Sequence, residues 1–112
     1  MEDRALIEYA CLAAGMTGWL YGYRMLDDRS YEYGMTKDGI LWNPLTDDGD
    51  ALRLAIKLNI DIMFFKGFQE VLCCGQGDID SNTIEPYGDD IDASTRKAIV
   101  RCAAAEIGRA IQ

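Results

Sequence analysis

The fold is decided by one stretch near the middle of the chain, Trp42-Asn43-Pro44-Leu45-Thr46-Asp47-Asp48-Gly49-Asp50-Ala51. Asn43 can cap a helix and Pro44 suits its first position, so the stretch predicts a helix over residues 44–59. Thr46 is an alternative cap one turn later. The aspartates that follow favour the positive end of the helix dipole.

The predicted middle helix has an apolar stripe that should face a core. The stripe consists of Ala51, Leu52, Ala55, Ile56 and Leu58. Arg53 and Lys57 lie four residues apart on the side expected to face water. Asn59 suits the left-handed conformation that ends a helix.

A helix is also predicted at each end of the chain. Over residues 2–14 apolar residues recur three and four apart, and Gly15 is a natural stop. Over residues 92–111 an apolar seam runs along one face, and Asp92 can cap the start.

Strands are predicted between these helices. Alternating aromatic residues indicate two short strands within 18–42, and either 18–25 pairs with 31–35 or 31–36 pairs with 40–42. Residues 60–75 are also typical of strands, with Lys66-Gly67 either a turn between two strands or a bulge in one. Residues 75–91, rich in Gly and acidic side chains, are predicted to be a loop.

The element order is therefore α-β-β-α-β(β)-α. At 112 residues the chain fits a single α/β domain over 1–112. We expect a small, largely antiparallel sheet sandwiched by three helices, because short turns join neighbouring strands.

The charge balance excludes several classes of partner. Nineteen acidic residues against 11 Lys and Arg give a net charge of −8. Direct binding to nucleic acid is not expected, because phosphates require clustered Lys and Arg. Docking on anionic membranes is disfavoured for the same reason, and no apolar run is long enough to span a bilayer. A partner protein with a basic surface would suit this charge.

The cysteines and the N-terminus indicate a cytoplasmic setting. Residues 1–4 lack the basic start of a signal peptide. Cys11 and Cys102 lie in helical patterns, and no C-x-x-C pair is present, so all four thiols are expected to be reduced. Cys73 and Cys74 are adjacent in a strand, so we expect one to be buried and the other to face outward.

Catalytic, metal and cofactor sites are not expected. The chain has no histidine, so acid–base chemistry would depend on other side chains, and none stands out. Asp78, Asp80, Asn82 and Asp89 imitate the spacing of a calcium loop, but Thr83 stands where the sharp turn needs glycine. The interpretation we favour is a solvated acidic loop without a metal.

Three stretches together resemble the phage ABA sandwich domain family, small proteins of phages and prophages without an assigned activity. They are Gly18-Trp19, the stretch 42–51 quoted above, and the Ala-rich closing helix with Ala98-Ile99-Val100-Arg101 and Ala103-Ala104-Ala105. The resemblance covers nearly the whole chain, and its middle stretch is the most specific part. It implies a sheet sandwiched by helices and expression in the cytoplasm of an infected bacterium.

Two functions remain as hypotheses. The first is an acidic interaction protein that occupies the surface of a host protein, for example one of a defence system. Its contact residues would be Asp47, Asp48, Asp50, Asp78, Asp80, Glu85, Asp89 and Asp90.

The second hypothesis is a small-molecule binder, for example a sponge for a signalling nucleotide. Aromatic rings would stack on a base and cations would meet phosphates. Its residues would be Tyr21, Tyr23, Arg24, Arg29, Tyr31, Tyr33 and Lys37. A homo-oligomer formed through the Ala-rich closing helix is compatible with both hypotheses, although packing of that helix on its own sheet explains the alanines better.

Overall fold

Three helices and six strands make up the chain in the computed structural model, which describes residues 2–75 and 82–110, with only the backbone for 108–110. The elements, in chain order, are α1 (Asp3–Ala13), β1 (Leu20–Met25), β2 (Tyr31–Lys37), β3 (Ile40–Trp42), α2 (Asp48–Lys57), β4 (Asp61–Phe65), β5 (Glu70–Cys74), β6 (Thr83–Pro86) and α3 (Ile91–Ala110). No helix in the described ranges is both long enough and apolar enough to cross a membrane.

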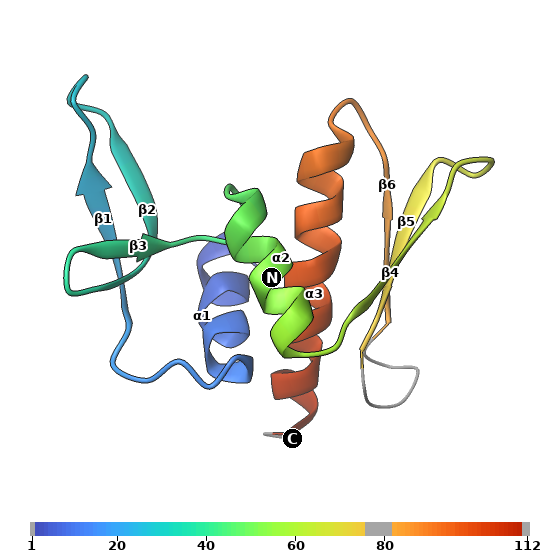
Figure 1. The fold of residues 1–112 in the computed structure, drawn as a ribbon, viewed down its shortest axis with the longest axis horizontal. Coiled ribbons are helices and arrows are strands. Elements are labelled where there is room, and N and C mark those ends of the chain that lie inside the picture. The colour runs from blue at the N-terminus through green and yellow to red at the C-terminus, as the bar shows by residue number, and fades with distance from the viewer. Residues whose placement is uncertain (1, 76–81, 111–112) are drawn as a thin grey trace.

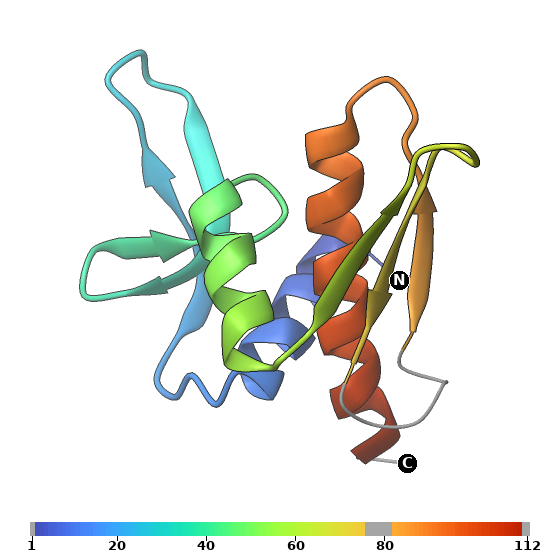
Figure 2. The same cartoon turned by 45° about the vertical axis from the view of Figure 1, so that its right-hand side comes forward.

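The strands form two separate antiparallel sheets, β1-β2-β3 and β4-β5-β6, with the helices between them (Figure 1). The α/β class and the antiparallel pairing are confirmed. The arrangement differs from the expected single sheet, because the first sheet packs against α1 while the second packs against α3. The helices therefore separate the two sheets, and backbone hydrogen bonds cannot join them (Figure 2).

Both of the hairpins that the sequence left open are formed in the first sheet. β1 pairs with β2 from Leu20↔Thr36 to Met25↔Tyr31. β2 then pairs with β3, with Met35 opposite Trp42. The outer half of the β1–β2 hairpin projects beyond the helices (Figure 1).

The second sheet corrects the prediction of a loop over residues 75–91. Lys66-Gly67 belongs to a turn, and β4 pairs with β5. Residues 83–86 form a third strand, β6, with Glu85 opposite Val71. Glu85 faces the helices and is only 8 % exposed. Its buried carboxylate accepts a hydrogen bond from Arg101 of α3.

The start of α2 lies later than the sequence predicted. Asp47, and neither Asn43 nor Thr46, is the cap: its carboxylate accepts a hydrogen bond from the Asp50 amide. The Asn43 side chain instead accepts from Leu45 N and donates to Tyr33 O, so it caps the turn before the helix and anchors it to β2. Asn59, at φ 53°, ends the helix as predicted.

The predicted stripe of α2 is only partly correct. Ala51, Leu54 and Ala55 are buried, whereas Leu52 is 55 % and Ile56 65 % exposed. The buried residues lie on the side of α2 that packs against α3. In the described part of the chain, the exposed pair lines a depression that α2 forms with residues 59–62 at the start of β4.

The core lies where the helices meet. Its main members on α1 and α3 are Leu6, Ile7, Ala10, Cys11, Ala98, Ile99, Val100, Cys102, Ala103 and Ala104. Small residues let α1 and α3 approach closely, so the alanines of the closing helix serve packing within the chain. Helix α3 is capped by Asp90 rather than Asp92, since the Asp90 carboxylate accepts from Ala93 N.

Candidate functional site

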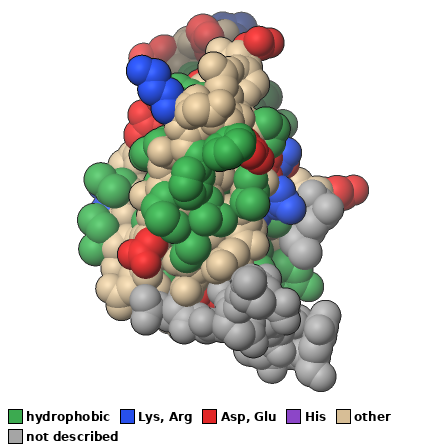
Figure 3. Space-filling model, turned by 90° about the vertical axis from the view of Figure 1, so that its right-hand side faces the viewer, with side chains coloured by type: hydrophobic (Ala, Val, Ile, Leu, Met, Phe, Trp, Pro, Cys, Tyr) green, Lys and Arg blue, Asp and Glu red, His purple; other side chains and the backbone are tan. Residues whose placement is uncertain are grey.

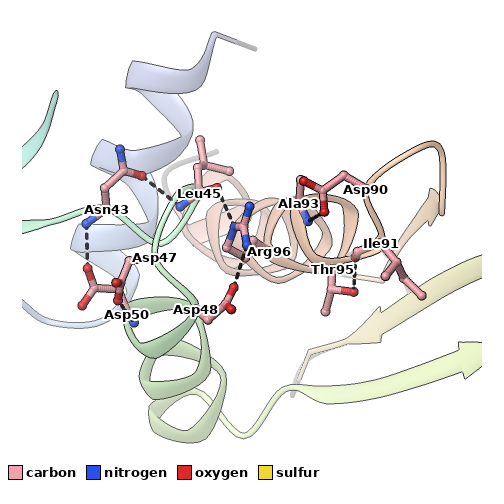
Figure 4. A network of polar contacts seen from close by, with 10 residues as sticks. All are labelled: Asn43, Leu45, Asp47, Asp48, Asp50, Asp90, Ile91, Ala93, Thr95 and Arg96. Atoms are coloured by element: carbon pink, nitrogen blue, oxygen red, sulfur yellow. Dashed lines mark hydrogen bonds and ion pairs between the residues drawn. The ribbon is translucent and has the colours of Figure 1, made fainter. Parts of the chain in front are cut away.

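The first predicted contact group, Asp47, Asp48 and Asp50, makes internal bonds. Asp50 accepts a hydrogen bond from Asn43 N at 3.0 Å and one from Arg53 at 2.8 Å. Asp48 accepts from Nη1 of Arg96 at 2.6 Å (Figure 4). These carboxylates therefore help to hold α2 against β3 and α3, although the Asp48 side chain keeps 74 % of its surface exposed.

The other acidic residues predicted as contacts do not form one surface. Asp78 and Asp80 lie outside the described residues. Glu85 is buried against Arg101, so its assignment to an exposed contact loop is wrong. Asp89 and Asp90 lie at the exposed start of α3, where Asp90 is occupied as the cap.

The aromatic residues predicted for a ligand do gather. Tyr23, Tyr31 and Tyr33 lie on one face of the β1–β2 hairpin, 51 to 63 % exposed, with ring centroids 5.1 and 6.2 Å apart. Tyr21 is partly buried on the same face, below the Arg4 guanidinium.

The cations predicted to accompany these rings are placed elsewhere. Arg24 alternates to the opposite face of the hairpin and pairs with Glu32 at 2.6 Å. Lys37 donates to Thr17 O, and Arg29 lies in the β1–β2 turn. The depression of about 360 Å³ beside the tyrosines has Asp3 and Glu32 among its lining residues and no Lys or Arg. This geometry does not favour a phosphate.

An apolar groove of about 800 Å³ lies between α2, α3 and β4. We call it the α2–β4 groove. It is lined by Asp48, Ala51, Leu52, Ile62, Phe64, Lys66, Tyr87, Ile91, Asp92, Thr95, Arg96 and Ile99.

The groove exists because β4 overhangs the helices. Strands β5 and β6 pack on α3, while β4 lies at the edge of the sheet nearer α2 (Figure 2). Ala51 and Thr95 are too small to fill the space between β4 and the two helices. Leu52 of α2 and Phe64 of β4 therefore lie on opposite walls of the groove, and each is 55 % exposed.

Charged side chains lie around the groove. The N-terminal ends of α2 and α3 lie at the same end of the molecule (Figure 1), and each brings a carboxylate to the rim, Asp48 and Asp92. Arg96 is already paired with Asp48, and its Nε donates to Leu45 O at 2.8 Å. Within residues 2–75 and 82–110, neither Asp89 nor Asp92 has a hydrogen-bond or ion-pair partner. Asp92 is therefore the rim carboxylate available to a cation, while Lys66 and the paired Arg96 add positive charge to the same lining.

The thiols are not arranged for chemistry. Cys73 is fully buried, and burial, followed by Cys102 and Cys74, raises its pKa to about 12. Burial and then Glu8 raise the pKa of Cys11. Cys74 is partly exposed, which confirms the predicted alternation of the adjacent pair. Over the described part of the chain, no three His, Cys, Asp or Glu side chains lie close enough to hold a metal ion.

Sequence reasoning did not find the groove, because its walls come from residues 48–52, 62–66 and 87–99. The available signal was an excess of apolar residues. The middle helix carries Leu52, Leu54 and Ile56, which occupy more than one face, so not all of them can be buried against one neighbour.

No family model matches the chain, and neither the curated proteins nor the solved structures contain a match.

Proposed function

We propose that this protein acts by binding another protein, and that the α2–β4 groove receives an amphipathic helix of the partner with Leu-like residues on one face and Lys or Arg beside them. The observation that carries the proposal is the juxtaposition of an open apolar groove with rim carboxylates on a chain of net charge −8. Apolar anchors would supply affinity and the charges would supply orientation and a fast association rate.

A helix is the occupant that suits these walls. Two of the three walls are helices, and Leu52 of α2 and Thr95 of α3 flank a floor that includes the buried Ile99, which is a surface that a further helix can pack against. A bare anion is disfavoured, since Arg96 is already paired with Asp48 and Asp92 would oppose the attraction of Lys66. The absence of histidine from the chain and the apolar lining suit binding better than acid–base catalysis.

The cellular setting belongs to the same proposal. The resemblance to the phage ABA sandwich family supports action in the cytoplasm of a bacterial host. The partner would then be a host protein with a basic surface. Of the acidic group first considered as the contact surface, only Asp48 lines the groove, while Asp50 and Glu85 lie elsewhere and bond within the chain.

Capture from bacterial lysate tests this proposal when matched variants are compared. Leu52→Asp places a charge in the groove, and Leu12→Asp places the same charge at a 60 % exposed leucine of α1. We expect a host protein that is captured by the wild type and by Leu12→Asp, is lost with Leu52→Asp, and is released as salt rises. Equal capture by the two variants would contradict the assignment of the groove.

A further inference from the structure

The outer face of the second sheet is apolar at its centre. Met63, Leu72 and Ile84 lie side by side in register across β4, β5 and β6. Phe65 and Phe68 extend this row along the β4–β5 hairpin, and Phe68 is 78 % exposed. The half-buried Glu70, opposite Phe65 in register, lies beside them. We call the five apolar residues the outer apolar face; Figure 3 shows hydrophobic side chains gathered over its centre, with charged side chains mainly around them.

Among the described residues, this face does not belong to the hydrophobic core. An antiparallel sheet that packs one face on a helix usually turns polar residues to water on the other. The inward residues here, Val71 and Cys73, are fully buried towards the helices. The outward residues in register beside them, Met63 and Ile84, are 39 % and 56 % exposed. The apolar character of the outer face therefore has no explanation within one chain.

The area is sufficient for a pair of identical faces. With roughly 200 Å² for a whole aromatic side chain, the exposures leave on the order of 500 Å² of apolar surface on the face. Two such faces would bury about 1,000 Å² before any surrounding residue is counted, which is the lower bound for a specific interface.

We propose that the outer apolar face is the interface of a homodimer, in which two copies of the β4-β5-β6 sheet pack face to face about a twofold axis. A twofold interface brings the same patch against itself, so it needs a surface free of like charges at its centre. The central row Met63-Leu72-Ile84 meets that condition, while the chain as a whole carries −8. Face-to-face packing of two sheets is a common way to bury such rows.

A second copy suits this face better than the basic partner proposed for the groove. The central row has no carboxylate, and Glu70 lies one row away beside Phe65, so a basic surface would lose its hydration over the central row without gaining an ion pair there. Two chains of −8 repel each other through the rest of their surfaces, and salt screens that repulsion. The dimer should therefore strengthen as salt rises, whereas binding in the groove should weaken.

Sedimentation velocity over a range of protein and salt concentrations tests the proposal. We expect the wild type to approach twice the 12.5 kDa of one chain as concentration and salt rise. Phe68→Asp and Ile84→Thr should each raise the dissociation constant of the dimer about tenfold or more. The matched controls are Leu20→Asp and Ile40→Thr on the first sheet, at 74 % and 60 % exposed residues, and they should leave it unchanged. Circular dichroism checks that each variant is folded.

Three results would overturn the proposal: a wild type that stays monomeric up to its solubility limit, folded Phe68→Asp and Ile84→Thr variants that dimerise as the wild type does, or controls that disrupt the dimer equally. The outcome is separable from that of the groove, because Leu52→Asp should leave dimerisation intact and Phe68→Asp should leave partner capture intact.

Discussion

Arg96 on α3 joins the start of α2 through two contacts, an ion pair to Asp48 at 2.6 Å and a hydrogen bond from Nε to Leu45 O at 2.8 Å. The Arg96 side chain is only 17 % exposed, whereas that of Asp48 is 74 % exposed. The guanidinium therefore fixes the N-terminal end of α2 against α3, beside the α2–β4 groove that both helices line.

Replacing the two partners of this contact should have unequal effects. Asp48→Asn removes an ion pair with one exposed member, which costs about 1 kcal/mol or less of unfolding free energy and is screened by salt. Arg96→Ala also leaves the Leu45 carbonyl without its donor, so we expect a loss of about 2 kcal/mol that persists in high salt. Urea denaturation at two salt concentrations measures both, and equal losses for the two variants would be inconsistent with this geometry.

Gly34 on β2 allows the chain after β3 to pass close by. A Cβ at Gly34 would lie 2.6 Å from Trp42 O and 3.0 Å from Asn43 Cβ. Gly34→Ala should therefore lower the unfolding free energy by about 2 kcal/mol or more, because backbone must move.

The control is Gly22→Ala, at the residue directly opposite on β1. Its Cβ would meet only the Thr36 side chain, at 3.2 Å. We expect that variant to lose about 1 kcal/mol or less, because a side chain can yield more easily than backbone. Similar losses in the two glycine variants, measured by thermal or urea unfolding, would refute the close approach.

Burial of Cys73 predicts a loss of stability in alkali. Its pKa is raised from 9.0 to about 12 in the folded chain. Above about pH 9 the unfolded chain releases a proton that the folded chain keeps, so the unfolding free energy should fall between about pH 9 and about pH 12. The slope from this thiol is at most about 1.4 kcal/mol per pH unit.

Cys73→Ala isolates that contribution, because the tyrosines and lysines titrate in both proteins. Unfolding free energies of the variant should be lower near neutral pH owing to the cavity. The difference between variant and wild type should then narrow as the pH rises above about 9. A constant difference across that range would show that the thiol does not titrate on unfolding as proposed.

The elements that the sequence predicted well are those fixed by local signals. Gly15 ends α1 at φ 69°, and Asn59 ends α2 at φ 53°, each in the left-handed region that the sequence indicated. The strands of the first sheet follow from their alternating residues, although the sequence offered the two hairpins as alternatives and the structure forms both. Such features depend on residues within a few positions of one another, so no tertiary contact was needed to infer them.

The errors arose where distant residues decide the outcome. Several residues before α2 can cap a helix. Asn43 does not cap α2, because its side chain bonds to Tyr33 O on β2. β6 has the composition of a loop, and its inward Glu85 is tolerated only because Arg101 lies opposite it on α3. The sequence alone does not show these partners.

The candidate site shows the same difference between features set by nearby residues and features set by distant ones. The sequence identified aspartates before both helices, and Asp48 does lie on the rim of the groove. It did not identify Leu52 or Phe64 as groove residues, since the groove appears only when α2 and β4 are placed on either side of α3. The arrangement of two sheets around three helices was also beyond local patterns, because strand runs do not specify which sheet they join.

The most direct test of the central claim is the fluorescence anisotropy of a labelled amphipathic helical peptide of leucine and lysine, titrated with the protein. We predict binding that weakens with salt, that falls about tenfold or more in Leu52→Asp, and that is unchanged in Leu12→Asp. A peptide with the same leucines and glutamate in place of lysine should not bind, because the rim carboxylates repel it. Equal affinity of the two variants for the lysine peptide, or equal binding of the two peptides, would contradict the account of the α2–β4 groove as an acidic-rimmed docking site.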